Sequence, residues 1–129
     1  MDRHWHILYC DEAARACPVT DFINGCAPKH QVKIMRFLAL LEEMGSTLPR
    51  PYADILYDGI HELRVKLSGE QIRLLYFFCF QKFIVLYYAF VKTSSRVPDR
   101  LIRKVAEYRG DLLERIDHNQ LESVIRADI

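Results

Sequence analysis

Three strand-like segments follow one another between residues 60 and 92, separated by turns of only two residues. In the first, Ile60 to Leu67, apolar and charged side chains alternate along the chain. Ser68-Gly69 separates it from Gln71 to Phe80, and Gln81-Lys82 separates that segment from Phe83 to Lys92. Because two-residue connections join antiparallel neighbours, the sequence predicts a three-stranded antiparallel meander.

Two further elements are predicted before the meander. Trp5 to Cys10 is a short apolar run, which we interpret as a first strand. Lys29 to Met44 has apolar residues at helical spacing, and Pro28 and Gly45 suit its start and its C-terminal cap. The segment 46–52 contains two prolines, so we expect an extended connector there.

The C-terminal part of the chain is predicted to be helical. Pro98 opens a helix that continues through Tyr108, and Gly110 interrupts it. Asp111 to Ile125 has the spacing of a further amphipathic helix. The 129 residues are therefore expected to form one α+β domain, in which the meander packs on N-terminal helices and a C-terminal helix carries a helical tail.

Composition excludes some functional classes. Lysine plus arginine total 18 and aspartate plus glutamate total 17, so the net charge gives no global sign of nucleic-acid binding. The four cysteines form no CxxC pair and no Cys/His spacing typical of zinc, so we expect neither a metal nor a cofactor. Cys10, Cys17 and Cys26 could pair with one another, although nothing else indicates an oxidising compartment. No long apolar segment follows a basic start, so we expect a cytoplasmic protein that does not enter a membrane.

The two turns fix the register of the meander. With two residues in each turn, charged side chains fall on one sheet face, opposite an apolar face that packs on the helices. They form two adjacent rows, Arg64–Arg73–Phe90 and Lys66–Gln71–Lys92. This register pairs Phe80 with Phe83, and a single bulge would shift the rows apart.

The charged rows allow two interpretations. Four cations at one end of a sheet face repel one another, and only Glu62 and Glu70 lie near them. Beside the rings of Tyr88 and Phe90, such a cluster suits an anionic ligand with stackable bases, namely RNA. The alternative is that arginine and lysine merely solvate the open face of a half-buried sheet.

An ordered series of short motifs runs through the second half of the chain. It comprises Gly59, Glu62-Leu63-Arg64, Arg73-Leu74-Leu75-Tyr76, Phe90-Val91-Lys92, Pro98 and Ala106. The series resembles the phage-derived HigB-like branch of the RelE superfamily, over about residues 19–109. The tail, residues 110–129, lies outside the resemblance.

The resemblance implies a RelE-like fold and the toxin of a type II toxin–antitoxin pair. Such a toxin is a metal-independent, ribosome-dependent mRNA endonuclease, in which the 2′-hydroxyl attacks the adjacent phosphate to give a cyclic phosphate. Arg64, Lys66 and Arg73 match strand positions that hold RNA phosphates, and Lys92 matches the first lysine of a loop element. Lys66 and Lys92 are the candidates for proton transfer. The implied partners are the ribosome, mRNA and a cognate helix-turn-helix antitoxin, and a homo-oligomer is compatible with the resemblance.

Some positions depart from the family pattern. Thr93 occupies the place of the second lysine, where Arg96 is a candidate replacement, and no tyrosine stands at the place in the last helix where classical members carry one. Arg50, in the connector, is a further candidate for a phosphate contact. Other candidate RNA-binding residues are Tyr88, Phe90 and Arg96. His61 is an alternative base, but its parity places it on the packed face.

Two other functions remain open from the sequence. A non-catalytic RNA- or protein-binding regulator of the same fold is favoured by Thr93, because a cation is then missing from the site. A free-standing ribonuclease is favoured less, because such enzymes carry a His pair or a His/Glu pair that has no counterpart in this sequence.

Overall fold

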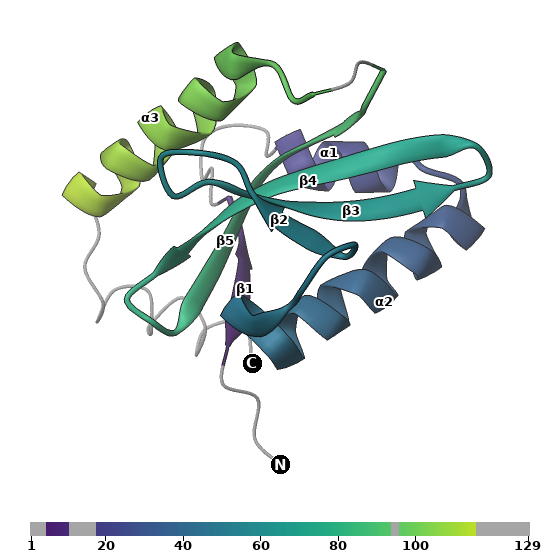
Figure 1. Cartoon of the computed structure of the whole chain (residues 1–129), viewed down its shortest axis with the longest axis horizontal. Coiled ribbons are helices and arrows are strands. Elements are labelled where there is room, and N and C mark those ends of the chain that lie inside the picture. Colours follow the sequence, from purple (N-terminus) through teal and green to yellow (C-terminus); the bar gives the residue numbers. More distant parts are fainter. Residues whose placement is uncertain (1–4, 11–17, 94–95, 116–129) are drawn as a thin grey trace.

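A computed structural model describes residues 5–10, 18–93 and 96–115 of the chain. The described residues form a five-stranded mixed sheet and three α-helices (Figure 1). In chain order the elements are β1 (His6–Tyr9), α1 (Pro18–Asn24), α2 (Pro28–Met44), a 3₁₀ turn η1 (Gly45–Thr47), β2 (Ala53–Ile55), β3 (His61–Leu67), β4 (Glu70–Cys79), β5 (Phe83–Val91) and α3 (Asp99–Arg115). The strand order is β1-β5-β4-β3-β2, with β1 parallel to β5 and the other pairs antiparallel. The predicted α+β class is confirmed.

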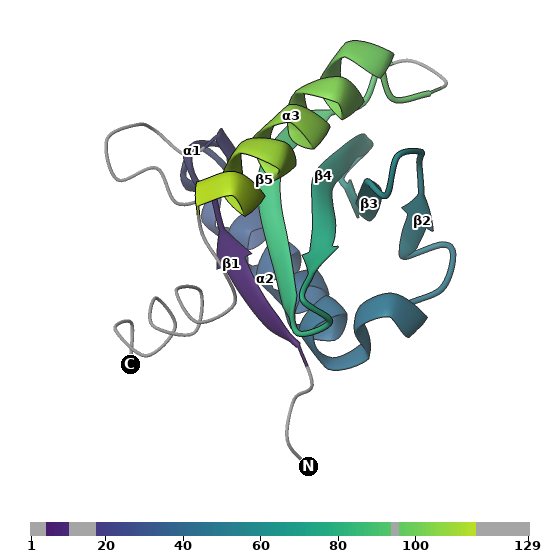
Figure 2. The same cartoon turned by 90° about the vertical axis from the view of Figure 1, so that its left-hand side faces the viewer.

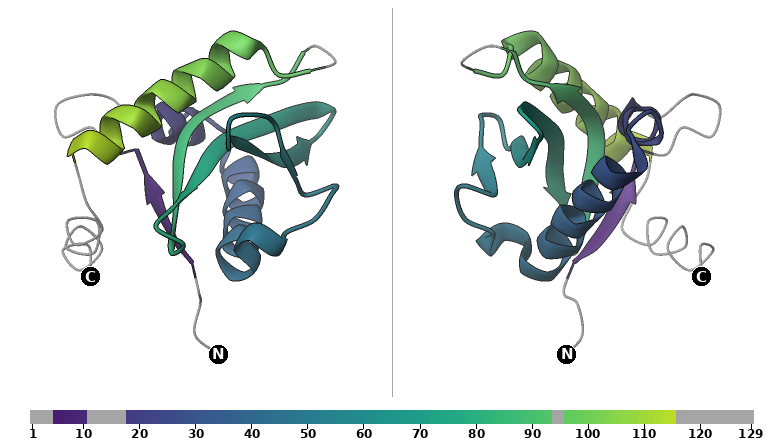
Figure 3. Two further views of the ribbon diagram at one scale, coloured as in Figure 1. Left: turned by 60° about the vertical axis from the view of Figure 1, so that its left-hand side comes forward. Right: turned by 90° about the vertical axis from the view of Figure 1, so that its right-hand side faces the viewer.

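Helices lie on both faces of the sheet (Figures 2 and 3). On one face, α2 buries Ile34, Leu38 and Leu41, and α1 packs beside it. On the other face, the ring of Tyr108 from α3 lies against Phe77 of β4, with centroids 6.4 Å apart. The predicted packing on N-terminal helices is therefore confirmed, while α3 covers part of the face that was expected to be open.

The β3–β4 hairpin has the predicted two-residue turn. Ser68 and Gly69 both have positive φ, 30° and 91°, as the tight turns of hairpins require. Leu67 consequently pairs with Glu70, and the register continues through Arg64 opposite Arg73.

The β4–β5 hairpin differs from the prediction in two places. Cys79, and not Phe80, pairs with Phe83, so that the turn has three residues. A bulge then shifts the register between Leu75 and Tyr76, which pair with Tyr88 and Leu86, so that no residue of β4 lies opposite Tyr87. The two displacements cancel, and the rows beyond the bulge have the predicted register. The bulge also has a packing role, because the Tyr87 ring stacks on Tyr108 of α3 at 4.4 Å.

The predicted connector 46–52 contains η1 and a turn, and the strand β2 that follows was missed. Ala53–Ile55 pairs with β3 and forms the edge of the sheet. A three-residue strand behind two prolines has no readable alternation, which explains the omission. The connector also contains a cis peptide bond between Arg50 and Pro51.

The predicted interruption at Gly110 is wrong, since α3 continues through it to Arg115. A helical glycine costs only about 1 kcal/mol relative to alanine. The next turn is fixed by Leu112, which is buried. The rest of the predicted second helix, from residue 116 on, lies outside the described residues.

The cysteines are in two states. Cys10 is disulfide-bonded, contrary to the reduced state expected for a cytoplasmic protein, while Cys26 and Cys79 are free thiols. Cys79 is buried in the core. In the described ranges, no helix has the length and apolar character needed to cross a membrane.

Candidate functional site

The two predicted rows are present on the sheet face that α3 partly covers. Arg64 lies opposite Arg73, which lies opposite Phe90. Lys66 lies opposite Gln71, whose carbonyl oxygen accepts a 2.7 Å hydrogen bond from the backbone N–H of Lys92. Side chains from three strands are therefore placed side by side, as the register predicted. We refer to this surface as the charged face.

The repulsion expected between the two arginines is offset by Glu62. This residue lies two positions before Arg64 in β3 and therefore on the same face. Arg64 Nε donates a 3.0 Å hydrogen bond to Glu62 Oε2, and Arg73 Nε lies 3.2 Å from Glu62 Oε1. One buried carboxylate thus holds both guanidinium groups.

Arg73 is not the exposed centre that the sequence predicted. Only 6% of the residue is accessible, and Glu62 exposes 2%. Its guanidinium also donates to Gln71 Oε1 at 2.8 Å and to the carbonyl oxygen of Ile72 at 3.2 Å. Burial lowers the pKa of Arg73, and the charge of Glu62 opposes that shift. In this structure Arg73 positions its neighbours, and its charged group does not lie open to a ligand.

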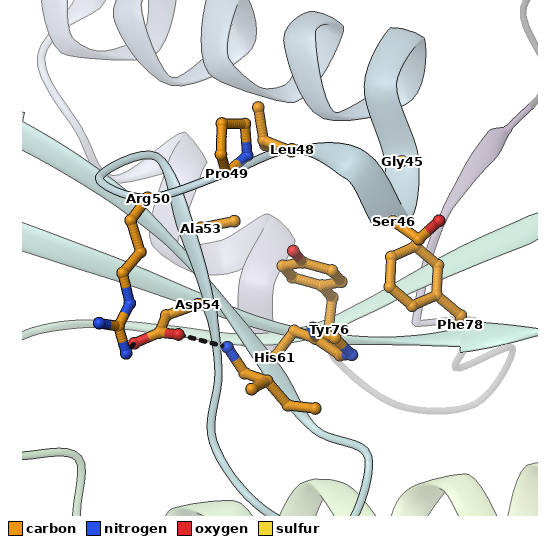
Figure 4. A pocket seen from close by; sticks show the side chains of 11 residues that line it. Gly45, Ser46, Leu48, Pro49, Arg50, Ala53, Asp54, His61, Tyr76 and Phe78 are labelled. Carbon is orange, nitrogen blue, oxygen red and sulfur yellow. Dashed lines mark hydrogen bonds and ion pairs between the residues drawn. The ribbon is translucent and has the colours of Figure 1, made fainter.

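The missed strand β2 adds an acid to the charged face. Asp54 Oδ2 lies 2.9 Å from Arg50 Nη2 (Figure 4), and it also lies 3.2 Å from Arg64 Nη2. The hydrogen bond from Arg50 is the main cause that holds the pKa of Asp54 below its usual value. Cations and acids consequently alternate in a chain that runs Arg50–Asp54–Arg64–Glu62–Arg73. The parity of Glu62 was readable from the sequence, whereas Asp54 could be found only by placing β2.

The cations of the charged face that make no ion pair among the described residues are its two lysines. Lys66 is exposed and Lys92 is half-buried, and neither side chain makes an ion pair within the described part of the chain. The half-buried rings of Tyr88 and Phe90 lie 6.1 Å apart beside them. Lys104 of α3 extends over the Tyr88 ring, with Nζ 5.4 Å from its centroid. In such an arrangement the lysines can bind phosphates, and bases can stack on the aromatic rings.

The loop between β2 and β3 is tied to α3. Arg109 Nη1 donates a 2.6 Å hydrogen bond to the carbonyl oxygen of Asp58, and its Nη2 lies 3.3 Å from Asp58 Oδ1. Tyr57 Oη donates to the carbonyl oxygen of Asp99, at the start of α3, at 3.4 Å. These contacts join β3 to α3 along one side of the charged face.

The remaining predicted residues lie at the edges or on the opposite face. Arg96 is exposed, and its Nη2 lies 3.3 Å from Asp99 Oδ1. His61 pairs with Tyr76, on the packed side as its parity predicted, and lines a cavity there. Among the residues with described positions, no group of three or more His, Cys, Asp or Glu is arranged to hold a metal ion.

Comparison with known families gives a match over more than half of the chain. The model of the family described as "Phage derived protein Gp49-like" matches residues 21–109, which include every side chain of the alternating chain and both lysines. No curated protein matches the sequence significantly.

Proposed function

The chain belongs to the Gp49-like family of phage-derived proteins, a RelE/toxin-like family, and from this premise we propose that it is the toxin of a type II toxin–antitoxin pair. Its activity would be ribosome-dependent cleavage of mRNA, as in the HigB-like branch of the RelE superfamily. The observation that carries the proposal is the charged face, on which Lys66 and Lys92 flank Gln71 beside the ring of Phe90.

The proposed reaction needs little covalent chemistry from the protein. The 2′-hydroxyl of one nucleotide attacks its own 3′-phosphate, the bond to the next 5′-oxygen breaks, and a cyclic phosphate remains. The protein must align the attack, stabilise charge on the phosphorane and protonate the leaving oxygen. Lys66 and Lys92 are proposed to bind the phosphate, and either ammonium group can donate the proton.

The other residues of the charged face are proposed to support the lysines. Tyr88 and Phe90 offer rings for stacking unpaired bases. Arg64, whose side chain is 31% exposed, can add a phosphate contact while Glu62 holds it in place. Arg73 acts on Arg64 through the same carboxylate and is a positioning residue. The proposed partners are the ribosome, mRNA and a cognate antitoxin with a helix-turn-helix domain.

The non-catalytic alternative is supported by a specific observation. Arg73, on the central strand, is 6% accessible and engaged by Glu62, and Thr93 replaces a lysine of the family pattern. A face with fewer available cations can still bind RNA or an acidic protein without stabilising a phosphorane. The same fold would then act as a regulator.

Controlled expression distinguishes the two functions. Induction of the wild-type chain without its antitoxin should stop growth and shorten translated messages, and the Lys92→Ala variant should do neither. Lys29→Ala removes an exposed lysine from α2 and is the matched control. Growth arrest with intact messages would support the regulator, and robust cleavage of protein-free RNA by the purified chain would contradict ribosome dependence.

A further inference from the structure

A cavity of about 360 Å³ opens beside the edge strand β2, with His61, Tyr76 and Phe78 lining it from the sheet face opposite the charged face. It lies between the segment that follows α2, including Leu48, Pro49 and Ala53, and a wall of aromatic side chains from β3 and β4 (Figure 4). Small-molecule sites begin at about 300 Å³. The volume therefore suits one planar ring system with a small substituent, and it is too small for a helix of a partner protein.

The aromatic wall is built from His61, Tyr76 and Phe78. The imidazole of His61 stacks on Tyr76, with centroids 5.4 Å apart and an interplanar angle of 21°. Phe78 meets His61 edge-on at 4.9 Å and is itself backed by Trp5 at 4.8 Å. Because every ring is supported by another, the wall is preformed for a flat ligand.

Polar groups of this wall have no partner in the described part of the protein. No hydrogen bond joins the imidazole of half-buried His61, or the hydroxyl of Tyr76, to any described residue. The polar atoms of both side chains are accessible, so they are available to a ligand in the cavity. Burial lowers the pKa of His61, so that at pH 7 its ring is neutral and presents one donor and one acceptor. The wall can thus bind the edge of a heterocycle that has both donors and acceptors.

A cation lies at the rim of the cavity. The side chain of Arg50 is 75% exposed, and its ion pair with Asp54 engages one terminal nitrogen. Asp54 is also paired with Arg64, so that its charge is shared by two guanidinium groups. The planar fork of Arg50 consequently has donors left for an anion, and it suits phosphate.

We propose that this cavity binds a nucleotide, with the base against His61 and Tyr76 and the phosphate on Arg50. The base supplies hydrogen-bond partners for the polar groups of His61 and Tyr76. The phosphate supplies a negative charge next to Arg50 at the rim. The nucleotide is either free or one residue of an RNA chain, since both present the same chemistry. The site shares Arg50 and Asp54 with the alternating chain at the edge of the charged face, but it does not depend on the proposed cleavage.

Calorimetric titration of the purified full chain tests the site. AMP should bind saturably, whereas adenosine, without the phosphate, and ribose 5-phosphate, without the base, should each bind at least tenfold more weakly. Arg50→Gln should lower the affinity for AMP about tenfold and leave that for adenosine unchanged. His61→Leu should weaken both ligands. Arg36→Gln, at an exposed position on α2, is the matched control and should change neither.

Two further measurements make the result decisive. Ser46→Trp places a large ring on the exposed rim of the cavity without touching the core, so it should abolish binding even if His61→Leu unfolds. A trinucleotide that binds at least tenfold more tightly than AMP would identify RNA as the source, and equal affinity would identify a free nucleotide. The proposal is overturned if AMP does not bind at millimolar concentration, if ribose 5-phosphate binds as well as AMP, or if Ser46→Trp binds normally. Growth arrest is not part of this readout, so the result is independent of the proposed toxin activity.

Discussion

Glu62 and Arg73 form an ion pair in which both residues are almost wholly buried. Arg73 Nε lies 3.2 Å from Glu62 Oε1, and the two residues are 6% and 2% accessible. Arg64 binds the other oxygen of the same carboxylate at 2.9 Å. The Glu62–Arg73 pair at the centre of the charged face is therefore an internal part of the fold, and the cations that make no ion pair among the described residues are the two lysines beside it.

Arg73→Ala should destabilise the protein. It leaves Glu62 buried with Arg64 as its remaining partner, and removing one partner of a buried pair costs about 3–5 kcal/mol. Urea unfolding should show this loss in the free energy of unfolding, whereas Arg36→Ala should stay within about 0.5 kcal/mol of the wild type. Two uncompensated arginines that only repel each other, as the sequence alone suggests, would instead give unchanged or higher stability. An Arg73→Ala variant as stable as the wild type would show that the Glu62–Arg73 pair does not stabilise the fold.

Lys92→Ala and Lys66→Ala should lose activity without losing stability. Each removes a charge-assisted phosphate contact worth about 1.5–3 kcal/mol, which corresponds to about a ten- to hundredfold lower rate of message cleavage. Neither lysine side chain has an ion-pair partner among the described residues, so the urea midpoint should not move. Full activity of both variants, with Lys29→Ala as the reference, would place the site elsewhere.

His61 should make the folded state sensitive to mild acid. Its pKa in the folded protein is lowered by burial, while the unfolded chain binds this proton near pH 6.5. Between these two values the unfolded state binds more protons, so the free energy of unfolding falls as the pH drops below about 7, by up to about 1.4 kcal/mol per pH unit. Unfolding curves of the wild type and His61→Leu, measured from pH 8 to 5, should differ by this slope. Parallel pH profiles of the two proteins would show that His61 titrates alike in both states.

Gly45 and Gly69 should respond differently to alanine. Both have positive φ, 53° and 91°, so each substitution carries a backbone cost of about 1–2 kcal/mol. A Cβ on Gly45 would also collide with the indole of Trp5, whereas a Cβ on Gly69 would meet nothing within 4 Å. Thermal unfolding should therefore show a loss larger by about 1–3 kcal/mol for Gly45→Ala. Equal losses would mean that Trp5 does not pack on this glycine.

The register of the charged face was predictable because turn chemistry fixes it. Ser68-Gly69 permits a two-residue turn, and alternation then determines which side chains share a face. For the second hairpin, the predicted rows are right because two unpredicted features cancel. These features are a longer turn and a bulge at Tyr87. No local pattern marks that bulge, and the ring on which Tyr87 stacks there, Tyr108, is distant in sequence.

The electrostatics of the site were less predictable than its register. Parity placed Glu62 beside Arg64, but only the packed structure shows that the carboxylate is buried and bridges to Arg73. Asp54 comes from a strand of three residues, too short for a periodic signal. Charge pairing of this kind depends on which side chains are buried away from water. Counting the like charges on one sheet face does not reveal which side chains are buried.

Primer extension on a message in a reconstituted translation system tests the central claim most directly. The purified wild-type chain should cut the message at defined positions when ribosomes are translating it, and leave it intact when ribosomes are omitted. Lys92→Ala, folded to the same extent, should cut at least tenfold more slowly, and Lys29→Ala should match the wild type. An intact message in the presence of translating ribosomes and folded wild-type protein would contradict the account and favour a binding protein without nuclease activity.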